Sequence, residues 1–200
     1  AGLQHFKNLV FDEVKSSVAT AILDLINTER DGTAIEHDIV RQSVMLFESM
    51  GLGRLDVYVN DFEKFLLENT KDYYTRKAES WLQNDDTPAY LVKAEKALEE
   101  EKKRVKNYLH PDTEPKILSV VEEEALGNHI SLLLEKEGSG CKVLLMNDKL
   151  EDLSRMFRLF ALVPHGLPPM ADVFKSHICD LGQEKLEARK TRLESQKEKE

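Results

Sequence analysis

The sequence predicts an all-α protein in which long helices, joined by short turns, stack as antiparallel neighbours in an elongated α-solenoid. Apolar residues recur at three- and four-residue spacing through most of the 200 residues, as on the buried face of a helix. Glycine and proline punctuate these patterns, and no segment alternates apolar and polar residues for long, as a half-buried strand would. Short connections between long helices favour antiparallel packing in a repeat architecture.

Two helical patterns lie between residues 72 and 110, separated by the polar run 83–87. Thr87 is predicted as the N-cap of the second helix, because its hydroxyl can accept a hydrogen bond from an unpaired backbone N–H. Pro88 is predicted as the first helical residue, since proline lacks only an N–H that would have no partner there. Pro111 ends this helix, because the residue before a proline is pushed out of the helical region.

The apolar stripe of this helix has a gap near Glu101, and its opposite face is typical of a solvated surface. Two ion pairs in the favourable i,i+4 orientation are predicted along it: Glu99 with Lys103, and Glu100 with Arg104. Nothing on the helix resembles a reaction centre. It is expected to bury one stripe against neighbouring helices.

Three further helices are predicted upstream, over residues 3–29, 35–50 and 57–82. The first two end at Asp31-Gly32 and at Gly51-Leu52-Gly53, which are typical C-terminal stops because glycine adopts the left-handed backbone without strain. Asp61 is a candidate cap for the main body of the third helix.

Downstream, Thr113 is predicted as the N-cap of a fifth helix, with Pro115 just inside it. This helix is expected to run through Leu134, and Gly138-Ser139-Gly140 is expected to break the pattern.

A short apolar element at 144–145 follows, and Asp148 is a candidate cap for a dense apolar helix over 150–162 that is expected to be well buried. A last helix is predicted from Met170. The charged tail after Gly182 carries only two large apolar residues seven positions apart, so it is expected to form a solvated or frayed helix.

The composition disfavours several classes of function. The net charge is −9 and basic residues alternate with acidic ones, which argues against nucleic acid as a partner. No apolar run approaches the roughly 20 residues that span a bilayer, so no membrane is expected either. Cys141 and Cys179, without a signal peptide, indicate a reduced, intracellular chain. The sequence begins at Ala1 rather than Met, and we interpret it as a fragment or processed product of a longer chain.

Residues that could carry chemistry are few and scattered. The run 138–142, GSGCK, lacks the spacing of a phosphate-binding loop and follows a helix rather than a strand, so it indicates a helix stop. Cys141 would need a histidine base, and His177 and Cys179 point to different helix faces. Residues 122–124, all glutamate, fan round a helix as a solvated acidic face. We therefore predict no catalytic, metal-binding or cofactor-binding residues.

Six runs in a fixed order carry a family resemblance. They are LINTERDG, DFEKFLLENTKDYY, YYTRKAESWLQ, PAYLVKAEKALEEEKKRVKNYLH, LLEKEGSGCKVLL and DKLEDLSRMFRLF, the last followed by Gly166-Leu167. Over residues 3–181 the chain resembles the amino-terminal region of cullins, and is most similar to the plant cullin-one type. The tail after Gly182 departs from the family, because it is more charged than the corresponding helix.

The resemblance implies a solenoid of five-helix cullin repeats. Residues 1–137 would be the second repeat of the family, and residues 138–200 would open the next repeat and add the charged tail. In the family, the first repeat binds an SCF-type adaptor with its F-box protein, and a C-terminal domain binds a RING protein. Those two binding regions fall outside the aligned part. The partners implied for this segment are other cullin repeats of the same scaffold, in the cytoplasm and nucleus.

The function implied is that of a non-catalytic, rigid scaffold segment of a cullin-RING ubiquitin ligase, which holds the substrate adaptor and the RING module at a fixed separation in ubiquitin-dependent protein degradation. One alternative is a helical-repeat tether or trafficking adaptor without ubiquitin chemistry. A truncated cullin-like form is another. An α-helical enzyme is disfavoured, because no nucleophile, base and orienting group are grouped in the sequence.

The residues expected to matter act through packing and not as a site: Trp81, Leu98, Leu133, Phe157 and Phe160. The helix over 150–162 could instead bind a partner, but so dense an apolar stripe more often belongs to a core. If Phe157 is fully buried, Phe157→Ala is expected to lower the free energy of unfolding by about 3–5 kcal/mol.

Overall fold

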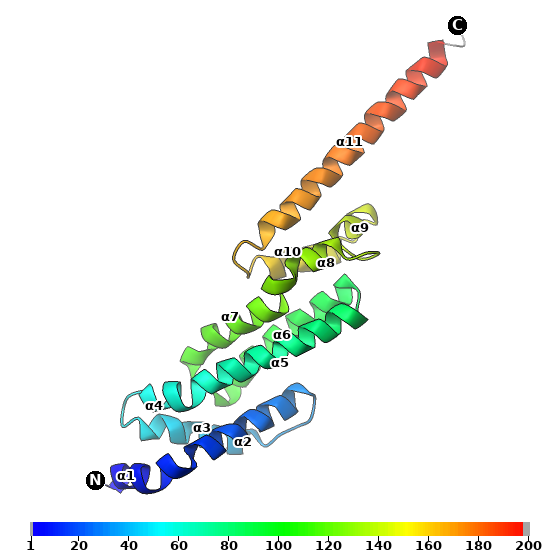
Figure 1. Ribbon diagram of the computed structural model, residues 1–200. Coiled ribbons are helices and arrows are strands. Elements are labelled where there is room, and N and C mark those ends of the chain that lie inside the picture. Colours follow the sequence, from blue (N-terminus) through cyan, green and yellow to red (C-terminus); the bar gives the residue numbers. More distant parts are fainter. Residues whose placement is uncertain (1, 198–200) are drawn as a thin grey trace. The chain divides into compact units, whose positions relative to one another are not determined.

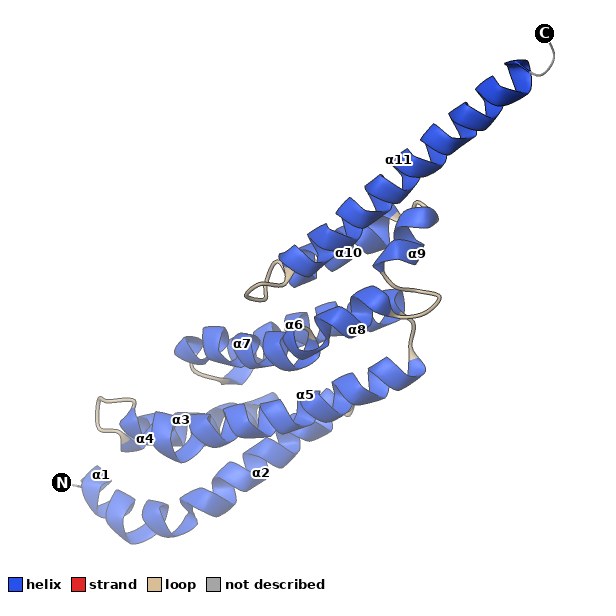
Figure 2. Cartoon of the chain, turned by 45° about the horizontal axis from the view of Figure 1, so that its top comes forward, coloured by secondary structure: helices blue, strands red, loops and turns tan. Residues whose placement is uncertain are grey.

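The computed structural model describes residues 2–197, and helices make up most of that range (Figure 1). No β-strand occurs within residues 2–197 (Figure 2), so the predicted all-α fold class is confirmed. The helices up to residue 108 are α1 (Gly2–Phe6), α2 (Asp12–Arg30), α3 (His37–Met50), α4 (Asp56–Tyr58), α5 (Lys64–Asn84) and α6 (Thr87–Tyr108). Those that follow are α7 (Glu114–Ala125), α8 (Ile130–Glu135), α9 (Cys141–Met146), α10 (Leu150–Phe160) and α11 (Leu167–Lys197).

The described residues group into two compact units. The first unit contains residues 2–80 and 94–125, and the second contains residues 81–93 and 126–197. The boundary between cullin repeats that the resemblance implies, after residue 137, stays a prediction.

Four aromatic side chains form the centre of the first unit. Phe11 meets Phe47 edge to face with ring centroids 5.2 Å apart, and Phe62 lies 5.4 Å from Phe47 and 5.6 Å from Tyr58. Phe11 and Phe62 both belong to π-helical turns, η1 (Lys7–Phe11) and η2 (Val59–Glu63). A π turn holds one more residue than an α turn and so re-aims the side chains on either side of it. All four rings are fully buried.

The second unit is held together by buried apolar side chains and by polar groups at helix ends. The Lys136 ammonium donates to the backbone carbonyl oxygens of Leu82 (2.5 Å) and Asp85 (2.6 Å). The last carbonyls of a helix have no partner within it, so this lysine closes the C-terminal end of α5. The Trp81 ring packs edge to face on Tyr90 at 5.7 Å, while Trp81 itself is only half-buried.

The N-cap of α6 differs from the prediction. Asp86 is the cap, because its Oδ1 accepts from the backbone N–H of Ala89 at 2.8 Å. Thr87 is fully buried instead, and its hydroxyl donates to the carbonyl oxygen of Leu133 at 3.1 Å. Two adjacent residues could each cap the helix, and the contact with Leu133 decides between them.

Thr113 also turns inward rather than capping α7. Its hydroxyl donates to Glu63 at 2.8 Å and lies 2.7 Å from the hydroxyl of Tyr58. It is the last residue of a short 3₁₀ turn, η3 (Pro111–Thr113), where the backbone N–H of Asp112 bonds to the His110 ring. A buried hydroxyl needs a partner more than an exposed helix end does, because water can satisfy the helix end.

The predicted fifth helix is two helices. It stops at Ala125, turns through η4 (Gly127–His129) and resumes as α8. Leu126 lies outside the helical region, with φ −128° and ψ −59°, and its side chain is fully buried. The run of three glutamates just before the break is not wholly solvated. Glu124 is buried and accepts from the hydroxyl of Thr75 at 3.0 Å.

The dense apolar helix, α10, is buried on one side only. Leu153, Met156 and Phe160 are buried, but Phe157 is 54% exposed, so the expectation of a fully buried Phe157 is wrong. Leu98 and Leu133 are buried as expected. The spacing of apolar residues shows that α10 is apolar on more than one side. Only the neighbouring helices determine which of these sides is covered.

Residues 183–194 are exposed, as predicted for the solvated tail. The helix begins at Leu167, three residues before Met170, and continues through Gly182 without a break to Lys197. The last three residues of the tail and Ala1 lie outside the described residues.

Phe160→Ala is expected to lower the free energy of unfolding by about 3–5 kcal/mol, because the ring is fully buried and leaves a cavity. Phe157→Ala is the matched control on the same helix and should lower it by less than about 1 kcal/mol, as for other exposed substitutions. Urea unfolding followed by circular dichroism measures both. Equal losses would contradict the orientation of α10.

Candidate functional site

The first unit contains a buried ion pair between Arg30 at the end of α2 and Glu101 in the middle of α6. Arg30 Nε donates to one carboxylate oxygen of Glu101 at 2.9 Å, and Nη2 donates to the other at 3.1 Å. The two side chains are 1% and 0% exposed. A bidentate arginine–carboxylate pair is among the stronger hydrogen-bonded arrangements in proteins and fixes both groups in orientation.

Arg104 extends this pair into a chain of four charges. Its Nη1 donates to Glu101 at 2.8 Å and its Nε donates to Glu29 at 2.8 Å. Two tyrosine hydroxyls also donate to these carboxylates: Tyr74 donates to Glu101 and Tyr108 donates to Glu29, each at 2.7 Å. We refer to these residues as the buried ion-pair network: Glu29, Arg30, Tyr74, Glu101, Arg104 and Tyr108.

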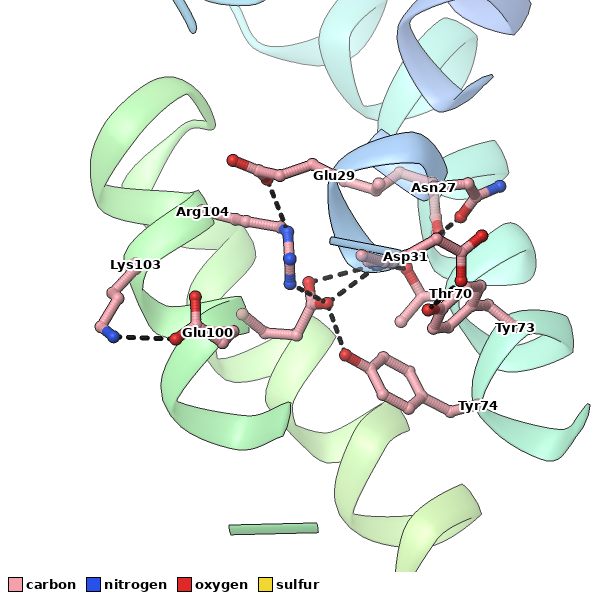
Figure 3. Close-up of polar contacts among 12 residues, drawn as sticks. Asn27, Glu29, Asp31, Thr70, Tyr73, Tyr74, Glu100, Lys103 and Arg104 are labelled. Carbon is pink, nitrogen blue, oxygen red and sulfur yellow. Dashed lines mark hydrogen bonds and ion pairs between the residues drawn. The ribbon is translucent and has the colours of Figure 1, made fainter. Parts of the chain in front are cut away.

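The network joins α2, α5 and α6, and in Figure 3 the side chains of Glu29, Tyr74 and Arg104 converge on one region from these three helices. On α5, the hydroxyl of Thr70 accepts from Arg30 Nη2 at 2.7 Å. The guanidinium of Arg30 also lies 5.2 Å from the Tyr73 ring centroid and 5.5 Å from that of Tyr74, within range of a cation–π interaction.

The removal of these charges from water is offset by complete hydrogen bonding. Among the described side chains, no buried nitrogen or oxygen atom lacks a hydrogen-bond partner. This condition matters because a buried charge without a partner is strongly destabilising, whereas a fully bonded one need not be. The network is therefore sensitive to the loss of any one member.

The pKa values of the two carboxyls follow from their surroundings. Burial alone would raise the pKa of Glu101, but the charges of Arg30 and Arg104 and the hydrogen bond from Tyr74 hold it below its ordinary value. Burial likewise opposes ionisation of Glu29, and the hydrogen bonds from Tyr108 and His37 and the charge of Arg104 lower its pKa overall. Both carboxylates are thus ionised at neutral pH.

Another buried carboxylate, Glu63, joins η2 to the start of α7. It accepts from Thr113 at 2.8 Å and from the Lys116 ammonium at 2.7 Å. Burial raises the pKa of Tyr58, whose hydroxyl contacts the same Thr113, to about 12. These contacts position helices rather than reactants, because each polar atom is occupied by a protein group.

Within the sequence run GSGCK, residues 138–140 form a compact turn between α8 and α9, and Cys141 and Lys142 begin α9. Gly138 has φ +72°, and a Cβ on Gly140 would collide with the carbonyl oxygen of Leu134. Ser139 Oγ accepts from the backbone N–H of Thr87 at 3.1 Å. Both glycines are therefore required by the backbone, and the run ends α8 as predicted.

Cysteine and histidine side chains do not gather into a site in the described part of the chain. Cys141 is buried and burial raises its pKa to about 11, so it is a poor nucleophile at neutral pH. Cys179 is exposed. Within residues 2–197, no three His, Cys, Asp or Glu residues are placed to hold a metal ion. The absence of catalytic, metal-binding and cofactor-binding residues stays a prediction.

Sequence reasoning missed the network, although the gap in the α6 stripe at Glu101 was its signal. The predicted i,i+4 pairs are wrong, because Glu100 pairs with Lys103 at 2.9 Å and Arg104 pairs with Glu101. A polar residue in an apolar stripe has a buried partner elsewhere in the chain. That partner, Arg30, is 71 residues away, so no local pattern identifies it.

The fold and the network define a helical scaffold whose polar contacts fix the positions of helices. Comparison with known proteins gives the family. All of residues 1–200 match the family described as Cullin, cullin alpha solenoid domain, and the chain belongs to the cullin family. None of the described helices combines the length and the apolar character that a membrane-spanning segment needs.

Curated plant relatives agree with this assignment. The chain is 45% identical over 177 residues to "Putative cullin-like protein 1" of Arabidopsis thaliana. The aligned stretch covers 88% of this chain and 24% of that protein. It is 42% identical over 181 residues to "Cullin-1" of Oryza sativa subsp. japonica, covering 90% and 24%. It is 40% identical over 181 residues to "Putative cullin-like protein 2" of Arabidopsis thaliana, covering 90% and 48%. The chain therefore spans between about a quarter and a half of the length of these relatives.

Glu101→Gln is expected to lower the free energy of unfolding by about 3–5 kcal/mol, because it leaves the buried Arg30 without a charge partner and Arg104 with Glu29 alone. Glu100→Gln is the matched control, one position away in a more exposed pair with Lys103, and should change it by less than about 1 kcal/mol. Chemical unfolding measures both variants. A Glu101→Gln variant as stable as the control would contradict the network.

Stability should fall in acid. The pKa of Glu101 and of Glu29 is lower in the folded chain than the ordinary 4.5, so their ionised forms stabilise the fold above pH 4.5. That stability is lost as the pH falls through the lowered folded-state pKa values. Thermal melts between pH 7 and pH 3 should show a steeper loss of Tm below about pH 4.5 in the wild type than in Glu101→Gln. Identical slopes would contradict the role of Glu101 in the loss of stability in acid.

Proposed function

We propose that this chain is a non-catalytic, rigid scaffold segment of a cullin-RING ubiquitin ligase of the SCF type. The observation that carries the proposal is the match of all 200 residues to the cullin solenoid domain. In this role the segment lies between a bound substrate adaptor with its F-box protein and the RING module, and acts in ubiquitin-dependent protein degradation in the cytoplasm and nucleus. Its own contacts are with neighbouring cullin repeats.

The buried ion-pair network supports this role through rigidity. A scaffold accelerates transfer between two bound modules only while their separation is held near the productive distance, since a flexible connection dilutes the effective concentration. Bidentate hydrogen bonds tolerate little change in distance or angle. The contacts of Arg30 and Arg104 therefore oppose sliding of α2, α5 and α6 along one another.

The principal alternative is a helical-repeat tether without ubiquitin chemistry, because the same architecture serves unrelated functions. A truncated cullin-like form is a variant of the first proposal, in which the segment acts apart from the modules at either end. Both alternatives keep the fold and the network. They differ from the proposal in whether the segment supports ubiquitin transfer when it is placed in a full-length cullin.

A chimaera tests the proposal. Residues 3–181 replace the matching segment of a full-length relative, such as the rice Cullin-1, which is then reconstituted with its adaptor, F-box protein and RING protein. We expect substrate ubiquitination at a rate within about threefold of the unmodified relative, since the modules keep their separation. Single-turnover transfer of labelled ubiquitin measures this rate.

The control chimaera carries a Gly/Ser linker with the same number of residues. It should be slower by about tenfold or more, because a flexible linker lowers the effective concentration of one module at the other. A chimaera with residues 3–181 that is no faster than the linker control would favour the tether.

A further inference from the structure

The short turn between α5 and α6 is held by a segment at the end of α8, within the second unit. The backbone N–H of Thr87 donates to Ser139 Oγ at 3.1 Å, and the Thr87 hydroxyl donates to the carbonyl oxygen of Leu133 at 3.1 Å. The Lys136 ammonium adds two hydrogen bonds to backbone carbonyls of the same turn. We refer to the residues that make these contacts as the clasp: Leu82, Asp85, Thr87, Leu133, Lys136 and Ser139.

Lys136 supplies the charged hydrogen bonds of the clasp. It is the C-cap residue of α8, and its ammonium donates to the carbonyl oxygens of Leu82 (2.5 Å) and Asp85 (2.6 Å) at the end of α5. The C-terminal end of a helix carries a partial negative charge, and hydrogen bonds from a charged donor are about twice as strong as neutral ones. One side chain therefore joins the C-terminal ends of two helices.

The backbone from which this side chain extends is itself fixed. The carbonyl oxygen of Lys136 accepts from the backbone N–H groups of Ser139 (3.2 Å) and Gly140 (2.7 Å). A Cβ on Gly140 would collide with the carbonyl oxygen of Leu134 and with the backbone of Lys136, so the turn is as tight as it can be. The position of the turn between α8 and α9 is thus transmitted through Lys136 to the end of α5.

Helices α5 and α6 both continue from the first unit into the second. The first unit contains α5 up to residue 80 and α6 from residue 94, and the second contains residues 81–93. A sharp bend within such a helix requires a break in its hydrogen-bond ladder. The third connection, between residues 125 and 126, falls where Leu126 leaves the helical region. The two helices are therefore the stiff connections, and the clasp fixes their shared end within the second unit.

We propose that Lys136 is a positioning residue for ubiquitin transfer, an inference that rests on the proposed function. By fixing the α5–α6 turn to the end of α8, it narrows the range of separations that the scaffold allows between the modules bound at its two ends. A narrower range raises the effective concentration of one module at the other. A lysine that served only as a helix cap would affect stability and leave both the distances and the transfer rate of the folded protein unchanged.

The first test measures distances in the 200-residue protein. Cys179 is exposed and Cys141 is buried, so one added cysteine, Ser119→Cys on the exposed surface of α7, gives a pair of spin labels. Lys136→Met keeps a long side chain but removes the charge and the donors. Pulsed electron paramagnetic resonance should show a broader distance distribution in Lys136→Met than in the unmodified chain. Lys136→Arg should restore the narrow distribution, because a guanidinium also donates to carbonyl oxygens.

Two further variants control this comparison. Lys142→Met removes another lysine of the second unit, one that is 58% exposed and pairs with Asp180 at 3.0 Å, and it should leave the distribution unchanged because exposed pairs contribute little. Ser139→Ala removes one neutral hydrogen bond of the clasp and should broaden the distribution less than Lys136→Met. It also serves as the test variant if circular dichroism shows that Lys136→Met does not fold.

The second test uses the full-length chimaera that carries residues 3–181. With Lys136→Met, single-turnover ubiquitin transfer should be about threefold slower than in the unmodified chimaera. The adaptor and RING concentrations that give half the maximal rate should not change, because the variant alters the separation of these modules and not their binding. Lys136→Arg should restore the rate, and Lys142→Met should not lower it.

Two outcomes would overturn the role of Lys136: distances equal to those of the unmodified chain in Lys136→Met, or broader distances with no loss of transfer rate. An unmodified chimaera no faster than the Gly/Ser linker control would instead contradict the proposed function. The distances in the 200-residue protein distinguish these failures, because they do not depend on ubiquitin chemistry.

Discussion

The hydrogen-bonded ion pair between Arg30 and Glu101 fixes how α2 and α6 meet in the first unit. Two charges removed from water are tolerated only if each finds its partners at close range. Those partners come from the end of α2, the middle of α5 and the middle of α6, and they include Tyr74 and Arg104. The helices must adopt one register for all of these hydrogen bonds to form together. Apolar packing alone would accept several registers.

The second unit uses polar groups at helix ends in a comparable way. Thr87, Ser139 and Lys136 bind backbone N–H and carbonyl groups at the ends of α5, α6 and α8. These contacts satisfy groups that a helix leaves without partners. Each unit thus combines a plain apolar core with a few polar contacts between residues far apart in the sequence. Such an arrangement suits a scaffold, in which a fixed geometry matters more than a reactive group.

Most of the helices could be predicted, because their apolar residues recur with helical period and their ends carry proline or glycine. The errors lie where two local solutions compete. Asp86 and Thr87 are both good N-caps, and the buried contact of Thr87 with Leu133 leaves the cap to Asp86. The break at Leu126 was missed because the apolar pattern continues across it, although the Leu126 backbone leaves the helical region and its side chain is fully buried.

The sequence by itself determined the helical fold class and the cullin family, because periodicity, end signals and ordered runs are local properties that do not depend on packing. Only the tertiary structure decided which side of each helix is covered. It places Glu101 at the centre of a network and leaves Phe157 about half exposed, the opposite of what residue polarity suggests. The physical reason is that burial depends on neighbours distant in sequence, and a buried charge is stable only where those neighbours supply its partners.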